Sequence, residues 1–168
     1  KHKFGENFVL LMSDHVFDYH TLKRLIRIKL QEDECALAID RTLDCVLDVA
    51  DTTKVISHSG HVKTLGKHLE KYNAYDTGMF LCSPVIFKVL EQTTRKGKYS
   101  LTNGMNVLVS QSKLRSFDNS GNFWSDCDTY ADIKFAEKKM LANLSKPAHG
   151  ILSKTVNRKV SSFITRFL

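Results

Sequence analysis

Residues 8–15 read Phe-Val-Leu-Leu-Met-Ser-Asp-His, five apolar side chains in a row followed at once by polar ones. A short apolar run that ends in turn residues is typical of a strand buried on both faces of a parallel sheet. We therefore predict a central strand over 8–12. A domain rarely opens on such a strand, because the strand needs neighbours on both sides. We therefore expect that strands preceding it in a parent chain are absent from this sequence.

Strands and helices alternate along the rest of the chain. Helical spacing of apolar residues is found at 19–29, 85–93, 100–110 and 129–141. Strand patterns are found at 34–40, 55–57, 61–65, 75–81, 116–117 and 122–124, the last two joined as a strand–turn–strand element. Ser59-Gly60 predicts a hairpin between 55–57 and 61–65, and Thr77-Gly78 interrupts the strand over 75–81. Thr129 and Asp132 stand close to the spacing of a capping box at the start of the last helix. The alternation predicts an α/β domain with a mixed sheet.

The composition is that of a globular domain of 168 residues, 42% hydrophobic and 26% charged. No apolar run approaches the ~18 residues that a membrane span needs. The four cysteines, Cys35, Cys45, Cys82 and Cys127, have no CxxC spacing. We therefore expect reduced, mostly buried thiols in a cytoplasmic protein, and neither disulfides nor a zinc site.

The net charge of +7 is unevenly distributed along the chain. The first 142 residues carry only +2, and the remainder contains no acid and five basic residues, Lys146, Lys154, Arg158, Lys159 and Arg166. The charge therefore does not indicate a nucleic-acid-binding domain. Within 147–168, apolar residues recur near one helical face and the basic ones lie mostly elsewhere. Either a basic amphipathic helix at a membrane interface or a helix packed on its own domain would give this pattern.

Three acidic residues are candidates for a metal site. Asp14 follows the 8–12 strand, and ligands of open α/β sheets bind beyond the carboxyl ends of strands. Asp126 and Asp128 are two residues apart, so on an extended segment both could face one cation. The alternatives are that Asp14 is a turn or capping residue, that Asp128 caps the last helix and that Asp126 is solvated.

Two further segments could contact a ligand. Lys67 follows Gly66 at the end of the predicted hairpin, where a lysine can reach phosphate oxygens. Asn73 and Asp76 are polar residues just before Gly78 in an otherwise apolar strand, which favours a ligand close to the backbone. Ordinary surface and turn residues would also explain each of these positions.

The order of these segments resembles the nucleotidyltransferase superfamily. It is most similar to the inositol-1-phosphate cytidylyltransferase domains that are often fused to a membrane-embedded CDP-alcohol phosphotransferase. The resemblance extends from about residue 7 to 168 and is carried by 11–15, 66–67, 73–80 and 124–129. It implies a Rossmann-like nucleotidyltransferase sheet flanked by helices, with its C-terminal part at 1–145. A basic amphipathic juxtamembrane segment would follow at 146–168.

The resemblance also implies roles for individual residues. It implies a Mg²⁺ site formed by Asp14, Asp126 and Asp128. It implies that Lys67 contacts the acceptor phosphate, and that the acceptor pocket is lined by Asn73, Asp76 and Gly78. Asp14, Lys67 and Asp126 are thereby the expected catalytic residues.

The implied reaction is Mg²⁺-dependent transfer of a nucleotidyl group from an NTP, expected to be CTP, to a phosphorylated alcohol such as inositol 1-phosphate. The product would feed the phosphotransferase at the cytoplasmic face of an anionic membrane, with no nucleic-acid partner. Family members begin with a glycine-rich loop that cradles the NTP phosphates, whereas the glycines here are isolated. We therefore expect a fragment of a longer enzyme that is inactive alone. The alternative is a catalytically degenerate regulatory or scaffolding domain of a membrane-bound phosphotransferase.

Overall fold

The computed structural model describes residues 6–43 and 48–144, which form a mixed α/β fold. Its strands are β1 (Phe8–Leu11), β2 (His15–Phe17), β3 (Cys35–Asp40), β4 (Lys54–His58), β5 (His61–Gly66), β6 (Ala74–Cys82), β7 (Leu114–Asp118) and β8 (Trp124–Asp126). Its helices are α1 (Tyr19–Leu25), α2 (Val85–Thr94), α3 (Leu101–Ser110) and α4 (Tyr130–Leu144).

The main sheet has six strands in the order β1-β6-β3-β7-β5-β4. The β3–β7 pair is parallel and the other pairs are antiparallel, so the expected mixed sheet is confirmed. β4 also pairs with the beginning of β6, which closes the strands from β6 round to β4 into a ring. β2 and β8 form a separate two-stranded sheet.

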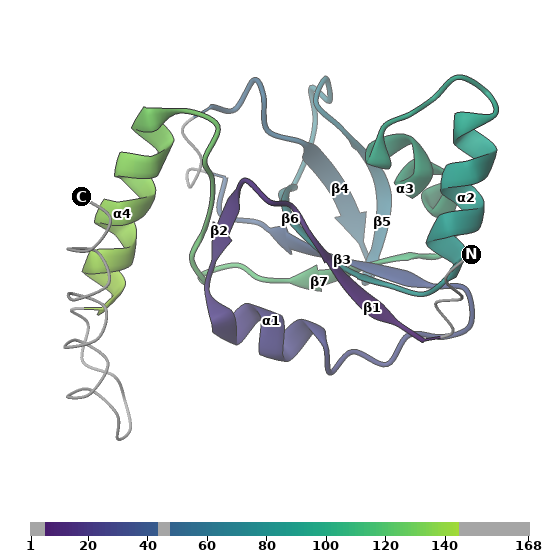
Figure 1. The fold of residues 1–168 in the computed structure, drawn as a ribbon, viewed down its shortest axis with the longest axis horizontal. Helices are drawn as coiled ribbons and strands as arrows, with labels where there is room; N and C mark the ends of the chain where they lie inside the picture. The colour runs from purple at the N-terminus through teal and green to yellow at the C-terminus, as the bar shows by residue number, and fades with distance from the viewer. Residues whose placement is uncertain (1–5, 44–47, 145–168) are drawn as a thin grey trace.

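Helices cover the main sheet on both sides (Figure 1). On one side, Leu37 and Ile39 of β3 share a core with Ile86 of α2 and Met105 of α3. On the other side, the intervening alanines of β3 belong to a smaller core with Leu25 of α1. Every residue of β3 is therefore buried, and β3 is the centre of the domain.

The expectation of a central, buried strand of a parallel sheet over 8–12 is wrong in three respects. β1 lies at the edge of the main sheet. β1 runs antiparallel to β6 instead of parallel to its neighbour, and its residues are half-buried or exposed. The strand is apolar throughout because both of its faces meet a core. Phe8 and Leu10 pack against the α2–α3 side, and Val9 packs against the α1 side. The apolar run thus reflects the layers of the fold and not the direction of pairing.

The strand–turn–strand order expected near residue 120 is present, but its two strands, β7 and β8, belong to different sheets. β7 pairs with β3 and β5, whereas β8 pairs with β2. The turn itself is present, with the Asp118 carboxylate accepting from the Ser120 backbone N–H and Gly121 at a φ of +82°. After the turn the chain crosses to the smaller sheet, where the Phe123 carbonyl accepts from the Asp18 N–H.

Helix starts follow the predicted capping residues. The Ser100 hydroxyl accepts the Asn103 N–H at the start of α3. At α4, the Asp132 carboxylate accepts from the Thr129 N–H, and the Thr129 hydroxyl accepts from the Asp132 N–H, so the capping box is confirmed. α4 stands at the end of the molecule away from α2 and α3 (Figure 1).

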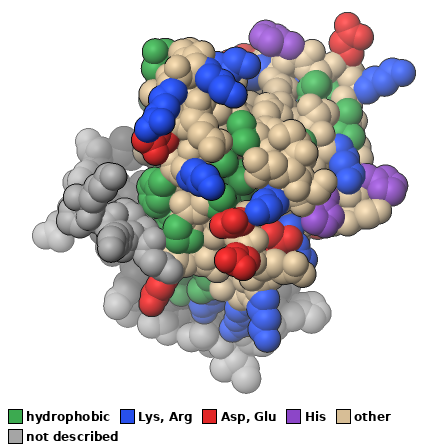
Figure 2. Space-filling view, turned by 90° about the vertical axis from the view of Figure 1, so that its right-hand side faces the viewer, with side chains coloured by type: hydrophobic (Ala, Val, Ile, Leu, Met, Phe, Trp, Pro, Cys, Tyr) green, Lys and Arg blue, Asp and Glu red, His purple; other side chains and the backbone are tan. Residues whose placement is uncertain are grey.

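On the face that carries α2 and α3, lysine and arginine side chains are scattered among apolar and acidic ones (Figure 2). Within the described part of the chain, no helix has the length and apolarity needed to cross a bilayer. The predicted basic segment at 146–168 and Cys45 lie outside the described residues. Cys35, Cys82 and Cys127 are free thiols; Cys35 and Cys82 are buried, as the sequence predicted, and Cys127 is half-buried.

Candidate active site

Six of the predicted site residues line one cleft of about 190 Å³, although they are far apart in the sequence. They lie after β1, at the end of β5, within β6, and at and just beyond the end of β8. The six residues are Asp14, Lys67, Asp76, Gly78, Asp126 and Asp128.

The wall of this cleft is built by an irregularity in β6. The register against β3 moves from Leu37↔Phe80 to Ile39↔Asp76, so β6 holds extra residues at this point. Gly78 adopts a φ of +73°, and its N–H donates to the Asp76 carboxylate at 2.8 Å. The predicted interruption of the strand at Thr77-Gly78 is therefore a β-bulge, a feature that often lies beside active sites.

Asp14 and Asp126 are brought together by two sets of backbone contacts. The loop after β1 is tied to β6 by the Met12 N–H, which donates to the Gly78 carbonyl at 3.0 Å. It is tied to the segment after β8 by the Cys127 N–H, which donates to the Asp14 carbonyl at 3.0 Å. In the β2–β8 pair, His15 lies directly opposite Asp126.

Asp14, His15 and Asp126 form a group whose potential metal-ligand atoms all lie within 4.8 Å of one another. Asp14 and Asp126 thus lie close together, while Asp128 lines the same cleft without belonging to this group. One oxygen of Asp126, Oδ1, is buried and has no hydrogen-bond partner among the described residues. A cation would satisfy that oxygen, so the donor set fits a divalent metal such as Mg²⁺.

Burial and neighbouring charges shift the pKa values of the carboxyl groups in the cleft. Burial raises the pKa of Asp126, and the charges of Asp128 and Asp14 raise it further, while His15 opposes them. Burial raises the pKa of Asp76 to about 6, against the hydrogen bond from the Gly78 N–H. Both shifts disfavour the charged carboxylates, chiefly through burial, and a bound cation would favour the charged forms again.

Lys67 lies at the rim of the cleft in an ion pair with Asp51, with 2.5 Å between Nζ and Oδ1. The hydrogen bond with Asp51 raises the pKa of Lys67, and the charges of Asp51, Asp128 and Asp126 add to the effect. The buried Lys54 donates through Nζ to the Lys67 carbonyl at 2.6 Å, which fixes the backbone here. Lys67 is thus a protonated, exposed cation beside the acidic group.

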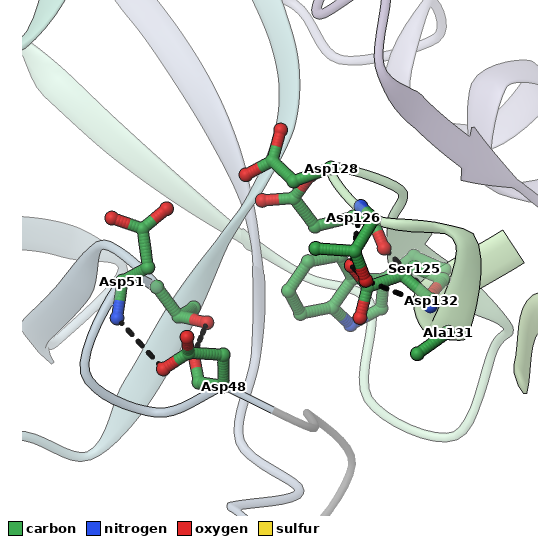
Figure 3. Close-up of a pocket in the computed structure, with 10 residues that line it drawn as sticks. Asp48, Asp51, Ser125, Asp126, Asp128, Ala131 and Asp132 are labelled. Atoms are coloured by element: carbon green, nitrogen blue, oxygen red, sulfur yellow. Dashed lines mark hydrogen bonds between the residues drawn. The ribbon is translucent and has the colours of Figure 1, made fainter.

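A second hollow of about 400 Å³ adjoins the cleft and shares Asp51, Asp126 and Asp128 with it. Asp51 faces Asp126 and Asp128 across this hollow, and Asp48 and Asp132 also line it (Figure 3). A phosphate group would be repelled from such a surface unless a cation accompanied it.

The seventh predicted residue, Asn73, is not brought into the cleft. Its side-chain oxygen accepts from the Ser57 N–H and its amide donates to the Ser57 carbonyl, both at 2.9 Å. The side chain therefore joins the segment before β6 to the irregular register of β4, which is a structural contact.

Two residues for which the sequence predicted no role belong to the site. Trp124 lines the cleft and stacks on His15 with ring centroids 5.9 Å apart. Its indole Nε1 donates to the buried Asp40 carboxylate at 2.8 Å. In the sequence, only the positions of Trp124 and His15 close to Asp126 and Asp14 point to a role. β2 and β8 are distant in sequence, and no local pattern predicts that they pair.

Comparison with known proteins gives relatives of one kind. The chain is 33% identical over 169 residues to the "Bifunctional IPC transferase and DIPP synthase" of Aquifex aeolicus. It is 32% identical over 171 residues to the protein of that name from Thermococcus kodakarensis. Each match covers 100% of this chain and 37% of the relative, so the chain spans little more than a third of their length. No protein-family model matches the sequence.

The fold has solved counterparts. The inositol-1-phosphate CTP transferase of T. maritima superposes with a TM-score of 0.67 at 24% identity, over 79% of this chain and 54% of the other. A putative glucose-1-phosphate thymidylyltransferase of Bacillus anthracis superposes with a TM-score of 0.64 at 12% identity, over 81% and 55%. Relatives and fold agree in kind: the chain is similar to IPC transferases over little more than a third of their length, and its fold is that of the nucleotidyltransferases.

Proposed function

We propose that this domain transfers a cytidylyl group from CTP to inositol 1-phosphate and releases pyrophosphate. The observation that carries the proposal is the convergence of Asp14, Asp126, Asp128 and Lys67 on one cleft. The names of the relatives, which combine an IPC transferase with a DIPP synthase, and the name of the T. maritima protein support the choice of substrates.

The chemistry needs positioning more than a covalent nucleophile. An oxygen of the acceptor phosphate attacks the α-phosphorus of CTP in line, and the bond from that phosphorus to the leaving pyrophosphate breaks. Lys67 holds the acceptor phosphate by charge, and the Asp76–Gly78 bulge shapes the acceptor side of the cleft. The aromatic wall at Trp124 and the bulge exclude water from the reacting groups.

Asp14 and Asp126 would hold a Mg²⁺ ion, with Asp128 beside it, and that ion would neutralise the phosphate charge that develops during transfer. Without a cation, the carboxylates of the cleft would repel both substrates. Asp14 is half exposed, with 45% of its side chain accessible, and this accessibility suits a ligand that must reach an incoming nucleotide.

The test is an assay of the full-length protein with CTP, inositol 1-phosphate and Mg²⁺, following CDP-inositol by ³¹P NMR and pyrophosphate release in parallel. UTP and glucose 1-phosphate serve as competing donor and acceptor. We expect product with the first pair and no turnover of the 168 residues alone, because the family's glycine-rich loop is not in this sequence. No transfer by the full-length protein with any pair would favour the regulatory or scaffolding alternative.

We also propose that residues 146–168 bring the domain to the cytoplasmic face of an anionic membrane, next to a fused or adjacent CDP-alcohol phosphotransferase. The support is the sequence alone, with five basic residues among apolar ones. Each basic residue near an anionic surface is worth about 1 kcal/mol, so binding should weaken as salt rises. Co-sedimentation with anionic vesicles, with and without 147–168, tests this. Equal binding of both chains would contradict it.

A further inference from the structure

We propose that His15 is a third ligand of the metal ion, bound through Nε2, so that the site carries one nitrogen among its oxygen donors and favours transition metals over Mg²⁺. The inference deepens the proposed function, on which it rests, but its test uses metal binding and no substrate.

The hydrogen bonding of His15 leaves the ligating nitrogen free. Nδ1 lies 2.9 Å from the Thr77 carbonyl oxygen. A carbonyl can only accept, so Nδ1 carries a proton, and Nε2 is the nitrogen that remains for a metal ion. Metal-binding histidines are commonly oriented in this way, by a hydrogen bond from the second ring nitrogen to a carbonyl.

The orientation of the ring is restricted by two neighbours, Trp124 and Gly78. The ring of Trp124 stacks on it at an interplanar angle of 27°, and Asp40 anchors that indole through Nε1. Gly78 comes so close to the ring that an added Cβ would lie 2.3 Å from Nδ1. Only 12% of the His15 side chain is exposed. The ring thus has little freedom to turn Nε2 away.

Nε2 points at the two carboxylates over distances that leave room for an ion. It lies 3.6 Å from Oδ2 of Asp126 and 4.0 Å from Oδ1 of Asp14. Ligands at about 2.1 Å in an octahedral site are separated by about 3.0 Å when adjacent and about 4.2 Å when opposite. Both distances lie between these two values and are too long for hydrogen bonds.

A nitrogen ligand changes which metals the site prefers. Mg²⁺ is bound through oxygen and keeps several waters, whereas imidazole suits the later divalent metals. His15 should therefore contribute more to the affinity for Mn²⁺ than to the affinity for Mg²⁺. We use Mn²⁺ as the probe because its EPR signal reports both binding and the nature of the ligands.

The experiment titrates the metal-free full-length protein with Mn²⁺ and records pulsed EPR of the bound ion. We expect modulation from a directly coordinated imidazole nitrogen in the wild type. Labelling histidine alone with ¹⁵N should change that modulation, a readout that needs no variant. His15→Gln should remove it and weaken Mn²⁺ binding about tenfold or more, with a smaller loss for Mg²⁺ in competition. His20→Ala, at an exposed histidine of α1, should match the wild type.

The opposite results would overturn the proposal. These are Mn²⁺ bound with oxygen ligands only, nitrogen modulation that survives His15→Gln, or no Mn²⁺ binding by the wild type. In the first two cases His15 would be a charge partner of Asp14 and Asp126. The transfer assay is independent: product formed by a protein without nitrogen coordination would refute this inference alone.

Discussion

Gly78 and His15 are in such close contact that any side chain at position 78 would collide with the imidazole: a Cβ there would lie 2.3 Å from Nδ1 and 2.6 Å from Cε1. Gly78 also has a positive φ of +73°. The backbone of β6 is therefore shaped to seat the ring that faces Asp14 and Asp126.

Gly78→Ala should lower both stability and metal affinity. A left-handed alanine costs about 1–3 kcal/mol in strain, and the clash adds to it. Gly97→Ala is the matched control, because Gly97 has a φ of +74° but no atom within 4 Å of an added Cβ. Urea unfolding and Mn²⁺ titration of both variants should show a larger loss of stability for Gly78→Ala, and weaker metal binding in that variant alone. Equal losses would mean that the contact with His15 is unimportant.

Asp14→Asn should abolish transfer while leaving the thermal midpoint nearly unchanged. The side chain is exposed, so its loss costs the fold little, but the variant loses a charged ligand. We expect turnover to fall by about 100-fold or more, since metal stabilisation of the transition state is worth several kcal/mol. Asp33→Asn, at an exposed aspartate paired with Lys113, is the control and should retain activity. Full activity of Asp14→Asn would remove Asp14 from the metal site.

Lys67→Ala should raise the KM for inositol 1-phosphate much more than the KM for CTP, because the lysine is expected to hold the acceptor phosphate. Its ion pair with Asp51 is exposed, so stability should change little. Lys63→Ala, at an exposed lysine of the same strand β5, controls for the loss of one positive charge. Steady-state kinetics with each substrate varied decides the point, and equal effects on both KM values would contradict this role.

Asn73→Ala should destabilise the fold and leave both KM values unchanged. The variant leaves the Ser57 N–H and carbonyl without their side-chain partners. Ser57 is buried, and leaving a buried polar group without its hydrogen-bond partner lowers stability by about 1–3 kcal/mol. Thermal unfolding and acceptor kinetics together test this. A raised acceptor KM with unchanged stability would instead support the acceptor-pocket role that the family resemblance implied.

Asp76→Asn should change the pH dependence of stability in metal-free protein. Burial raises the pKa of Asp76 from 3.8 to about 6. Because the folded pKa lies above the unfolded one, the stability that this group contributes is present below pH 3.8 and is lost as pH rises through 6. Asparagine keeps an acceptor for the Gly78 N–H and cannot ionise. As pH rises from about 4 to 7, the free energy of unfolding of the variant should therefore increase relative to that of the wild type, by at most about 3 kcal/mol.

Asp118→Asn gives the control of opposite sign for that experiment. Burial acts to raise the pKa of Asp118, but hydrogen bonds from Ser120 and the charge of Arg41 outweigh it and lower the pKa. The Asp118 carboxylate thus contributes stability above its unfolded pKa, and this stability is lost as pH falls. Urea unfolding across the pH range should show that Asp118→Asn becomes less stable relative to the wild type as pH rises. Parallel curves for the two variants would contradict both assignments.

Local features of the fold were predictable because they depend on neighbouring residues. The capping box at Thr129, the hairpin at Ser59-Gly60 and the interruption of β6 at Gly78 all follow from the chemistry of short segments. The pairing of β1 and of β8 was not predictable in this way. An apolar run shows that both faces are covered, but it does not show which strand lies alongside.

The same division holds for the site. Asp14 could be predicted from its place after a strand, Asp126 from its spacing to Asp128, and both from the family resemblance. His15 faces Asp126 only because β2 and β8 pair in one particular register, and nothing near either residue fixes that register. Asn73 lies in the segment that the resemblance assigned to the acceptor pocket, yet its polar atoms bond to the backbone of β4.

The reactivity of the cysteine thiols can distinguish unfolding of the main sheet from local movement of the cleft. Cys35 and Cys82 lie opposite each other on β3 and β6 and are fully buried, so a thiol reagent reaches them only when the sheet itself comes apart. Cys127 is half-buried beside Asp126 and Asp128, where movement of the cleft alone would uncover it. With Cys45 replaced by serine, the labelling rates of Cys35 and Cys82 would report global unfolding, and that of Cys127 would report local opening of the cleft. The rate at Cys127 alone would then slow when substrate or metal binds.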